Sequence, residues 1–136
     1  MPELSYLRST EGYKIATQNL QPQEIAAFEQ EYMTLCPLSR GGIAGRYVIG
    51  TDNNLRKFYL TIDSIKKVFL LNETRKATLF GLTYAKYNHF FLVMIYQSGN
   101  NLYERRIVLD KNLEEKSAMN FIGVLLMKNP DIKIGQ

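Results

Sequence analysis

Four adjacent pairs of basic residues are the side chains in this sequence best suited to bind phosphate or carboxylate groups. The pairs are Arg56-Lys57, Lys66-Lys67, Arg75-Lys76 and Arg105-Arg106. All four lie within residues 40–111, where 12 Lys or Arg residues stand against 5 Asp or Glu residues. The long-range electrostatic potential of a protein influences how it associates with partners rather than how it folds. We therefore take these residues as the candidate binding residues.

Side chains that could carry out covalent or acid–base catalysis are scarce. His89 is the only histidine, and it lies where a predicted turn becomes a strand, which favours a structural role. Cys36 lies at the end of a predicted helix, where the helix dipole opposes formation of a thiolate. One His and one Cys so far apart do not make a zinc site. We therefore predict that the protein is not an enzyme and needs no cofactor or metal.

The composition is that of a single folded domain, residues 1–136. Of the 136 residues, 46% are hydrophobic and 22% are charged, well away from the compositions of disordered chains. Cys36 is the only cysteine, so the chain fits a reducing compartment and we expect it in the cytoplasm. Its start lacks the pattern of a signal peptide, and the longest apolar run, residues 90–96, is too short to span a bilayer.

Two helices that would flank the basic segment are predicted from the spacing of apolar residues. The apolar residues of segment 22–35 recur at steps of three and four: Ile25, Phe28, Tyr32 and Leu35. Segment 113–128 carries a wide apolar face, follows a capping-box-like start at Asn112, and ends before a proline. Ahead of the first helix, turn-forming residues 9–12 lie between short apolar segments, which predicts a small hairpin within residues 1–19.

Six strand-like segments lie between the two helices and are separated by clusters of turn-forming residues. They are residues 46–49, 57–62, 67–71, 78–84, 90–96 and 103–109. Connections this short forbid helical crossovers, so neighbouring strands must run antiparallel, as a meander within residues 43–110. We therefore predict an α+β fold with an N-terminal helix, an antiparallel meander of about six strands, and a C-terminal helix packed on the sheet.

This order of elements resembles the pleckstrin-homology-like superfold in outline, and the resemblance implies a curled sheet closed by the last helix. The likeness covers the arrangement of residues 43–127. The chain contains no tryptophan, whereas one is usual in the final helix of that family, and the helix before the first strand is an addition. Because fold does not determine function, the lipid-binding habit of that superfold is only a weak guide here.

The predicted meander distributes the basic pairs over two rims of the sheet. Arg56-Lys57 and Arg75-Lys76 would open strands at one end, and Lys66-Lys67 would open the intervening strand at the other end. Arg105-Arg106 interrupts an apolar strand, so one of these arginines must extend to the surface, pair with an acid or face a partner. Tyr47 and Tyr59 are the aromatic candidates for stacking against nucleic-acid bases.

The function we predict is that of a small non-enzymatic adaptor or assembly module that binds a protein. Residues 90–96 are apolar on both faces of their strand and need cover from helices or from a second subunit. One version of the prediction is therefore a homodimer formed through this strand and the last helix. The alternative is a module that binds nucleic acid or anionic lipid through the basic strand ends. No transmembrane segment is predicted.

Overall fold

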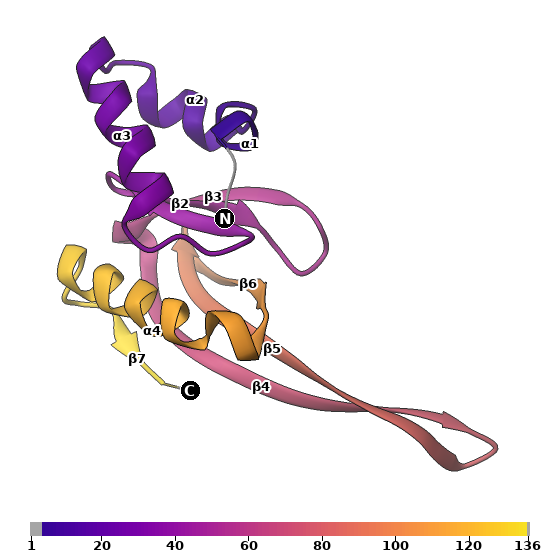
Figure 1. The fold of residues 1–136 in the computed structure, drawn as a ribbon. Coiled ribbons are helices and arrows are strands. Elements are labelled where there is room, and N and C mark those ends of the chain that lie inside the picture. Colours follow the sequence, from indigo (N-terminus) through magenta and orange to yellow (C-terminus); the bar gives the residue numbers. More distant parts are fainter. Residues whose placement is uncertain (1–3, 136) are drawn as a thin grey trace.

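Helices at both ends of the chain and antiparallel strands between them make up the fold (Figure 1). The computed structural model describes residues 4–135, except for the side chains of Arg75, Tyr84, Lys86 and Tyr87. The helices are α1 (Leu4–Arg8), α2 (Glu11–Thr17), α3 (Pro22–Thr34) and α4 (Lys111–Lys128). The strands are β1 (Gly41–Ala44), β2 (Tyr47–Thr51), β3 (Lys57–Thr61), β4 (Ile65–Leu79), β5 (Leu82–Ser98), β6 (Asn101–Leu109) and β7 (Lys133–Ile134).

The strands form two sheets, in the orders β1-β2-β3 and β6-β5-β4-β7. A short 3-10 helix, Ile62–Ser64, lies between β3 and β4 and redirects the chain, so the predicted meander divides at this point. Strands β1 to β3 pair antiparallel in chain order, as do β4 to β6, whereas β7 runs parallel beside β4. The predicted α+β class, with antiparallel strands and a C-terminal helix, is confirmed.

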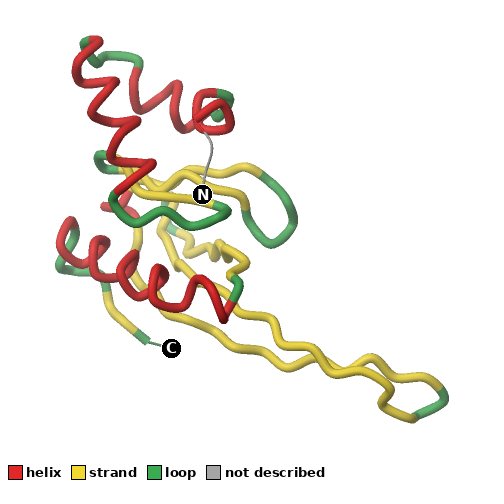
Figure 2. The backbone as a smooth tube through the Cα atoms, in the orientation of Figure 1, coloured by secondary structure: helices red, strands yellow, loops and turns green. Residues whose placement is uncertain are grey.

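The first sheet lies between two apolar layers, because successive residues of a strand point to opposite faces. On one face, Ala44 and Ile49 pack against Leu7, Phe28 and Tyr32 of the N-terminal helices. The other face belongs to the main core, together with the second sheet and α4. This core includes Ile43, Val48, Phe58, Leu60, Leu92, Met94, Ile107, Phe121 and Leu125. Helices α1–α3 thus cover the first sheet from outside, and α4 lies beside the second sheet (Figures 1 and 2).

Both helices predicted from apolar spacing are present. α3 begins with a capping box, in which Gln21 and Glu24 each accept a hydrogen bond from the other's backbone N–H group. α4 is capped by Asp110, two residues before the predicted cap, and its side chain accepts hydrogen bonds from the backbone N–H groups of Asn112 and Leu113. Local capping chemistry therefore fixes where each helix begins.

The hairpin predicted within residues 1–19 is wrong, because this segment forms α1 and α2. Thr10 is the N-cap of α2, and its Oγ1 accepts a hydrogen bond from the backbone N–H of Tyr13 at 3.1 Å. Gly12 lies so close to β3 that a Cβ atom there would stand 2.6 Å from the Cβ of Tyr59. The turn-forming residues thus join two helices and let α2 approach the sheet, and burial of Leu7 makes the helical arrangement favourable.

Strands β4 and β5 are much longer than predicted, and they form one continuous hairpin (Figure 2). The breaks predicted at residues 72–74 and around Asn88 do not occur, because Thr74 and Asn88 face each other across the ladder and their side chains hydrogen-bond at 2.8 Å. Residues 78–84, predicted to be a strand, instead contain the turn of the hairpin. Polar residues are tolerated inside these strands because both faces of the ribbon are exposed here.

We call residues 74–88 the arm, because β4 and β5 pair there only with each other. Strand β6 pairs with β5 as far as Phe90, and β7 pairs with β4 at Lys67 and Val68. The six residues of β4 from Thr74 to Leu79 extend the arm by about 20 Å. Figure 1 shows the arm projecting from the body of the molecule. Two-stranded ribbons without a third strand are marginally stable in water, so the arm depends on the sheet at its base.

The doubly apolar segment 90–96 is covered within the chain over most of its length. Phe90, Leu92 and Met94 are buried in the main core. On the opposite face Phe91 is buried, and Val93 lies between its cross-strand neighbours on β4 and β6. The segment therefore does not need a second subunit to remove its central residues from water.

Candidate functional site

Arg105 faces an acid of the same chain. Its Nη1 lies 2.7 Å from Oδ2 of Asp52, whose side chain is only 3% exposed. Oδ1 of Asp52 accepts hydrogen bonds from the backbone N–H groups of Asn54 and Arg56. Burial opposes charge on Asp52, but these hydrogen bonds outweigh it and hold the pKa of the carboxyl below its usual range. Arg105 is thus part of the structure rather than an open binding group.

Arg106 is also compensated by acids, on the other face of the same strand. Its Nε lies 2.6 Å from Oε2 of Glu104, and its Nη1 lies 3.5 Å from Oε1 of Glu73. Its guanidinium lies 5.4 Å from the centre of the Phe91 ring. Of the three alternatives left open for this pair, which were extension to the surface, pairing with an acid and contact with a partner, the structure shows pairing with acids for both members.

Lys57 and Arg105 line one hollow of about 210 Å³ between α2 and β3. The Nζ of Lys57 donates a hydrogen bond to Ser9 Oγ at 3.1 Å. Glu11 lines the same hollow, and Asp52 neutralises Arg105, so the charges balance. The hollow therefore does not favour an anion, although it brings together members of two basic pairs.

The remaining basic residues lie in separate places, so the predicted pair of rims is wrong. Arg56 is exposed in the loop between β2 and β3. Lys66 and Lys67 open β4 beside β7. Arg75 and Lys76 lie on the arm, far along β4 from its start, because β4 continues where a turn was predicted. Lys76 is exposed, and the side chain of Arg75 lies outside the described residues.

The two aromatic candidates do not offer a stacking surface. Tyr47 and Tyr59 lie side by side, with ring centroids 6.5 Å apart. Tyr47 is half-buried against the layer under the N-terminal helices, and Tyr59 is only 37% exposed. Because stacked bases need open ring faces, this pair gives little support to nucleic-acid binding.

His89 lies on β5 at the edge of a hollow beside the β2–β3 loop. Its ring stacks on Phe91 at 6.0 Å between centroids. The adjoining hollow, of about 490 Å³, is lined by Asn53, Asn54, His89, Phe91 and Val108. Across the β4–β5 ladder, Glu73 is the residue opposite His89. Within residues 4–135, apart from the four undescribed side chains, no group of three His, Cys, Asp or Glu residues could hold a metal ion.

Cys36 is a structural cysteine, and its reactivity tests the packing around it. The side chain is buried, and burial raises the pKa of its thiol to about 11. We expect the folded protein at pH 8 to react with a thiol reagent roughly a hundredfold more slowly than the urea-unfolded chain, because the thiolate fraction is small. Equal rates in the two states would mean that the main core opens around Cys36 in the folded protein.

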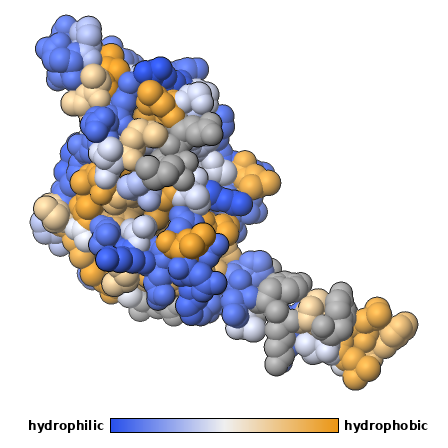
Figure 3. Space-filling model, viewed as in Figure 1, coloured by the Kyte–Doolittle hydropathy of each residue, from blue (hydrophilic) through white to orange (hydrophobic). Residues whose placement is uncertain are grey.

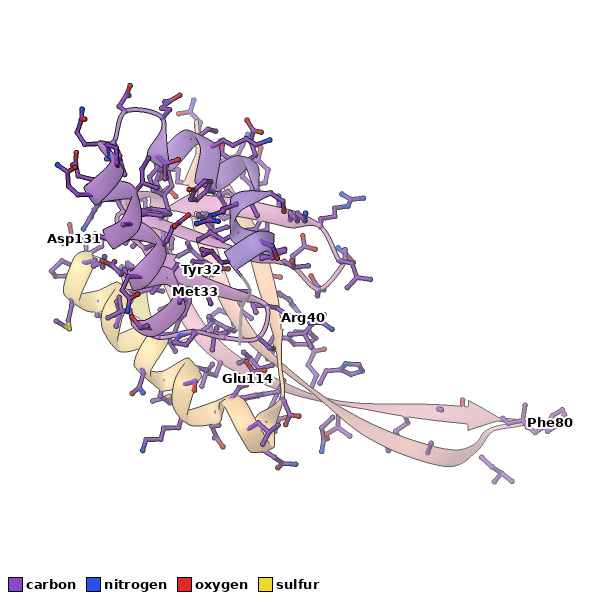
Figure 4. All side chains as sticks on the ribbon, turned by 45° about the horizontal axis from the view of Figure 1, so that its top comes forward. Tyr32, Met33, Arg40, Phe80, Glu114 and Asp131 are labelled. Atoms are coloured by element: carbon purple, nitrogen blue, oxygen red, sulfur yellow. The ribbon has the colours of Figure 1, made fainter. Side chains whose placement is uncertain are left out.

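Among the described side chains of the arm, three exposed apolar residues lie at its turn, which we call the tip: Leu79, Phe80 and Leu82. Their side chains are 60%, 93% and 73% exposed. Figure 3 shows a hydrophobic end on the arm, and Figure 4 shows Phe80 at its far end. The sequence pattern did not reveal the tip, because residues 78–84 are rich in the Thr, Leu and aromatic residues of a strand-like segment. The available signal was Gly81, the residue in this stretch best able to form a hairpin turn.

The backbone of Phe80 is strained. Phe80 and Gly81 form the two-residue turn, with φ angles of +53° and +78°. Turns with two positive φ angles favour Asn-Gly or Asp-Gly, whereas a bulky L-residue in the left-handed region costs about 1–2 kcal/mol. Among the described residues other than glycine, a positive φ is found at Phe80 and at Leu55. Because the side chain of Phe80 is 93% exposed, burial does not offset the cost of this backbone conformation.

Comparisons with known proteins found no match that could indicate a function. No protein-family model, no curated protein and no solved structure matches this chain. In the part of the chain that the structure describes, no helix is both long and apolar enough to cross a membrane. The resemblance to the pleckstrin-homology-like superfold thus stays one of outline, without support from a solved structure.

Proposed function

We propose that this chain is a non-enzymatic binding module that attaches to anionic membrane surfaces by inserting the tip of its arm. The observation that carries the proposal is Phe80, which is 93% exposed in a strained left-handed conformation at the end of a projecting ribbon. The apolar neighbours Leu79 and Leu82 extend the same exposed surface. Apolar surface concentrated at a projecting point suits a lipid layer, which needs no matching groove.

The charges of the arm match an anionic surface. Within residues 74–88, Arg75, Lys76 and Lys86 are basic and there is no Asp or Glu. Lys76 is exposed and lies three residues from Leu79, which corresponds to about 10 Å along a strand. Apolar groups of interfacial proteins are buried about 5–10 Å below the headgroups. When the tip is inserted, Lys76 therefore comes to the level of the lipid phosphates.

The free energy expected for membrane binding fits reversible attachment. Burial of a Leu or Phe side chain contributes about 1.5–3 kcal/mol, and a cation near an anionic surface contributes about 1 kcal/mol. Three apolar side chains and a few cations therefore provide several kcal/mol before the entropy of association is subtracted. We expect binding that depends on anionic lipid and weakens with salt.

The protein-binding prediction stays untested, and the tip supports it less well. A standard protein interface buries about 800 Å² on each partner, which is more than three side chains at the end of a ribbon supply. The homodimer version was motivated by segment 90–96 and the last helix. The central residues of the segment are covered within the chain, whereas Leu113, Met119 and Met127 of α4 are exposed. The anionic-lipid alternative draws on both the apolar tip and the charge of the arm, so we place it first.

A tryptophan reporter tests the proposal directly, because the chain contains no tryptophan. Phe80→Trp is mixed with phosphatidylcholine vesicles that either contain or lack phosphatidylserine. We expect its emission to shift to the blue only with the anionic vesicles, and the shift to decrease as salt is added. The matched control is Met127→Trp, on the exposed face of α4, where the native side chain is 83% exposed.

The outcomes separate the possible partners. A blue shift of Phe80→Trp without one of Met127→Trp supports insertion of the tip. No shift with either type of vesicle rejects the membrane proposal. A response to a single-stranded oligonucleotide in place of vesicles would assign the arm to nucleic acid, and equal shifts at both sites would mean nonspecific adsorption.

A further inference from the structure

The loop between β2 and β3, residues 52–56, repeats the unusual features of the arm tip. Leu55 is 73% exposed and has a φ of +63°, the same left-handed conformation as Phe80. Leu has no local reason to occupy such a position, where Gly or Asn would be favoured. The apolar side chain is thus held outward at a cost to the backbone.

The loop is fixed in place by the body of the protein. Asp52 accepts hydrogen bonds from the backbone N–H groups of Asn54 and Arg56, at 2.9 and 3.0 Å. The backbone N–H of Asn53 donates to the carbonyl oxygen of Arg106 on β6, at 2.9 Å. Leu55 therefore stands at a defined point relative to the second sheet, from which the arm extends.

The charge around Leu55 is of the same kind as that of the arm. Arg56 and Lys57 follow Leu55 directly, and both are exposed. Asp52 is the acid of this loop, and it is buried against Arg105. Lys57 opens β3 and its Nζ donates a hydrogen bond to Ser9 Oγ, so Arg56 is the cation that the loop itself presents beside Leu55. An apolar side chain next to a cation is the combination that anionic lipid surfaces attract.

The loop and the arm project from the same side of the molecule. Figure 1 shows the β2–β3 loop and the end of the arm both directed away from α3 and α4, and the turned view of Figure 4 agrees. A flat surface can therefore approach both projections without first meeting these helices. A groove in a small partner could not easily meet two points so far apart.

We propose that Leu55 and Arg56 form a second contact with the same anionic membrane that receives the tip of the arm. This inference rests on the proposed function, because the loop alone offers only one apolar side chain. Once the arm is bound, the second contact forms within a single complex, at a high effective concentration. Two contacts also fix the orientation of the body, whereas a single tip would leave the molecule free to rotate.

Two variants test this second contact. Leu55→Trp, mixed with the phosphatidylserine vesicles, is expected to shift to the blue as Phe80→Trp does. Leu55→Gly fits the positive φ and is expected to weaken vesicle binding about three- to tenfold, since the arm remains as the sole anchor. Leu113→Ala, which removes an exposed leucine from α4, is the matched control and should bind like the unmodified protein. Circular dichroism checks that each variant is folded.

The results distinguish this inference from the function on which it rests. A shift of Phe80→Trp without one of Leu55→Trp, or a Leu55→Gly variant that binds normally, overturns the second contact and leaves the arm as anchor. Absence of a shift at both positions rejects both proposals. A shift of Leu55→Trp alone rejects the arm as the anchor and, with it, the two-point arrangement.

Discussion

Phe80→Asn is expected to be more stable than the unmodified protein by about 1 kcal/mol and to bind anionic vesicles about ten- to a hundredfold more weakly. Asparagine adopts positive φ readily, so Asn-Gly at positions 80 and 81 relieves the strain of the turn. The same change removes the side chain that would enter the lipid. Urea denaturation measures the first effect, and vesicle sedimentation measures the second.

Opposite changes in stability and binding are the signature of a residue that serves a partner and not the fold. Phe80→Ala is the control, because alanine removes the apolar side chain without relieving the positive φ. It should lose binding without gaining stability. If Phe80→Asn were less stable than the unmodified protein, Phe80 would have to contribute to the fold. If it bound vesicles normally, insertion of the tip would be excluded.

Asp52→Asn is expected to lower the free energy of unfolding by about 2–3 kcal/mol. The substitution keeps an oxygen for the backbone N–H groups of the loop but removes the charge that Arg105 meets at 2.7 Å. Arg105 would then keep a partly buried charge without its acid. Urea denaturation measures the loss. The control is Asp63→Asn, because the pair of Asp63 with Arg46 is exposed, and its loss should cost less than about 1 kcal/mol.

The contribution of Asp52 to the free energy of unfolding should decrease as the pH is lowered. The pKa of its carboxyl is lowered in the folded protein, whereas in the unfolded chain it is about 3.9. The stabilisation by charge is therefore fully present above about pH 4–5 and is lost as the pH falls through the lowered pKa. The stabilities of the unmodified protein and of Asp52→Asn should converge in acid. A difference that stayed constant down to the lowest pH would show that charge is not its cause.

The helices show what local pattern can predict. The spacing of Phe28 and Tyr32 placed α3 correctly, because a helix repeats its buried face every three to four residues. The same reasoning located α4. It failed for α1 and α2, where the turn-forming residues around Thr10 fit a hairpin equally well. Packing of Leu7 beneath α3, which no short stretch of sequence reveals, decided between them.

The candidate site was only partly predictable. The excess of basic residues was visible in the sequence, but their grouping depended on the position of one turn. Polar residues inside an exposed ribbon resemble turn residues, because neither kind carries a burial pattern. Gly81 was therefore the signal for the turn, which lies between Leu79 and Leu82. Without it, residues 78–84 were predicted to be a strand. With that turn misplaced, Arg75 and Lys76 were assigned to the end of the sheet instead of the arm.

By itself, the sequence determined the α+β class, the two main helices and the antiparallel pairing. It also showed that an arginine of the Arg105-Arg106 pair must reach the surface, an acid or a partner. These properties follow from periodicity, short connections and the cost of an unpaired charge, all of which act locally. The tertiary structure alone decided which acid meets Arg105, since Asp52 is remote in sequence, and which apolar residues stay outside. Whether Phe80 and Leu55 are exposed depends on how segments distant in sequence pack around them, and a local sequence pattern does not contain this information.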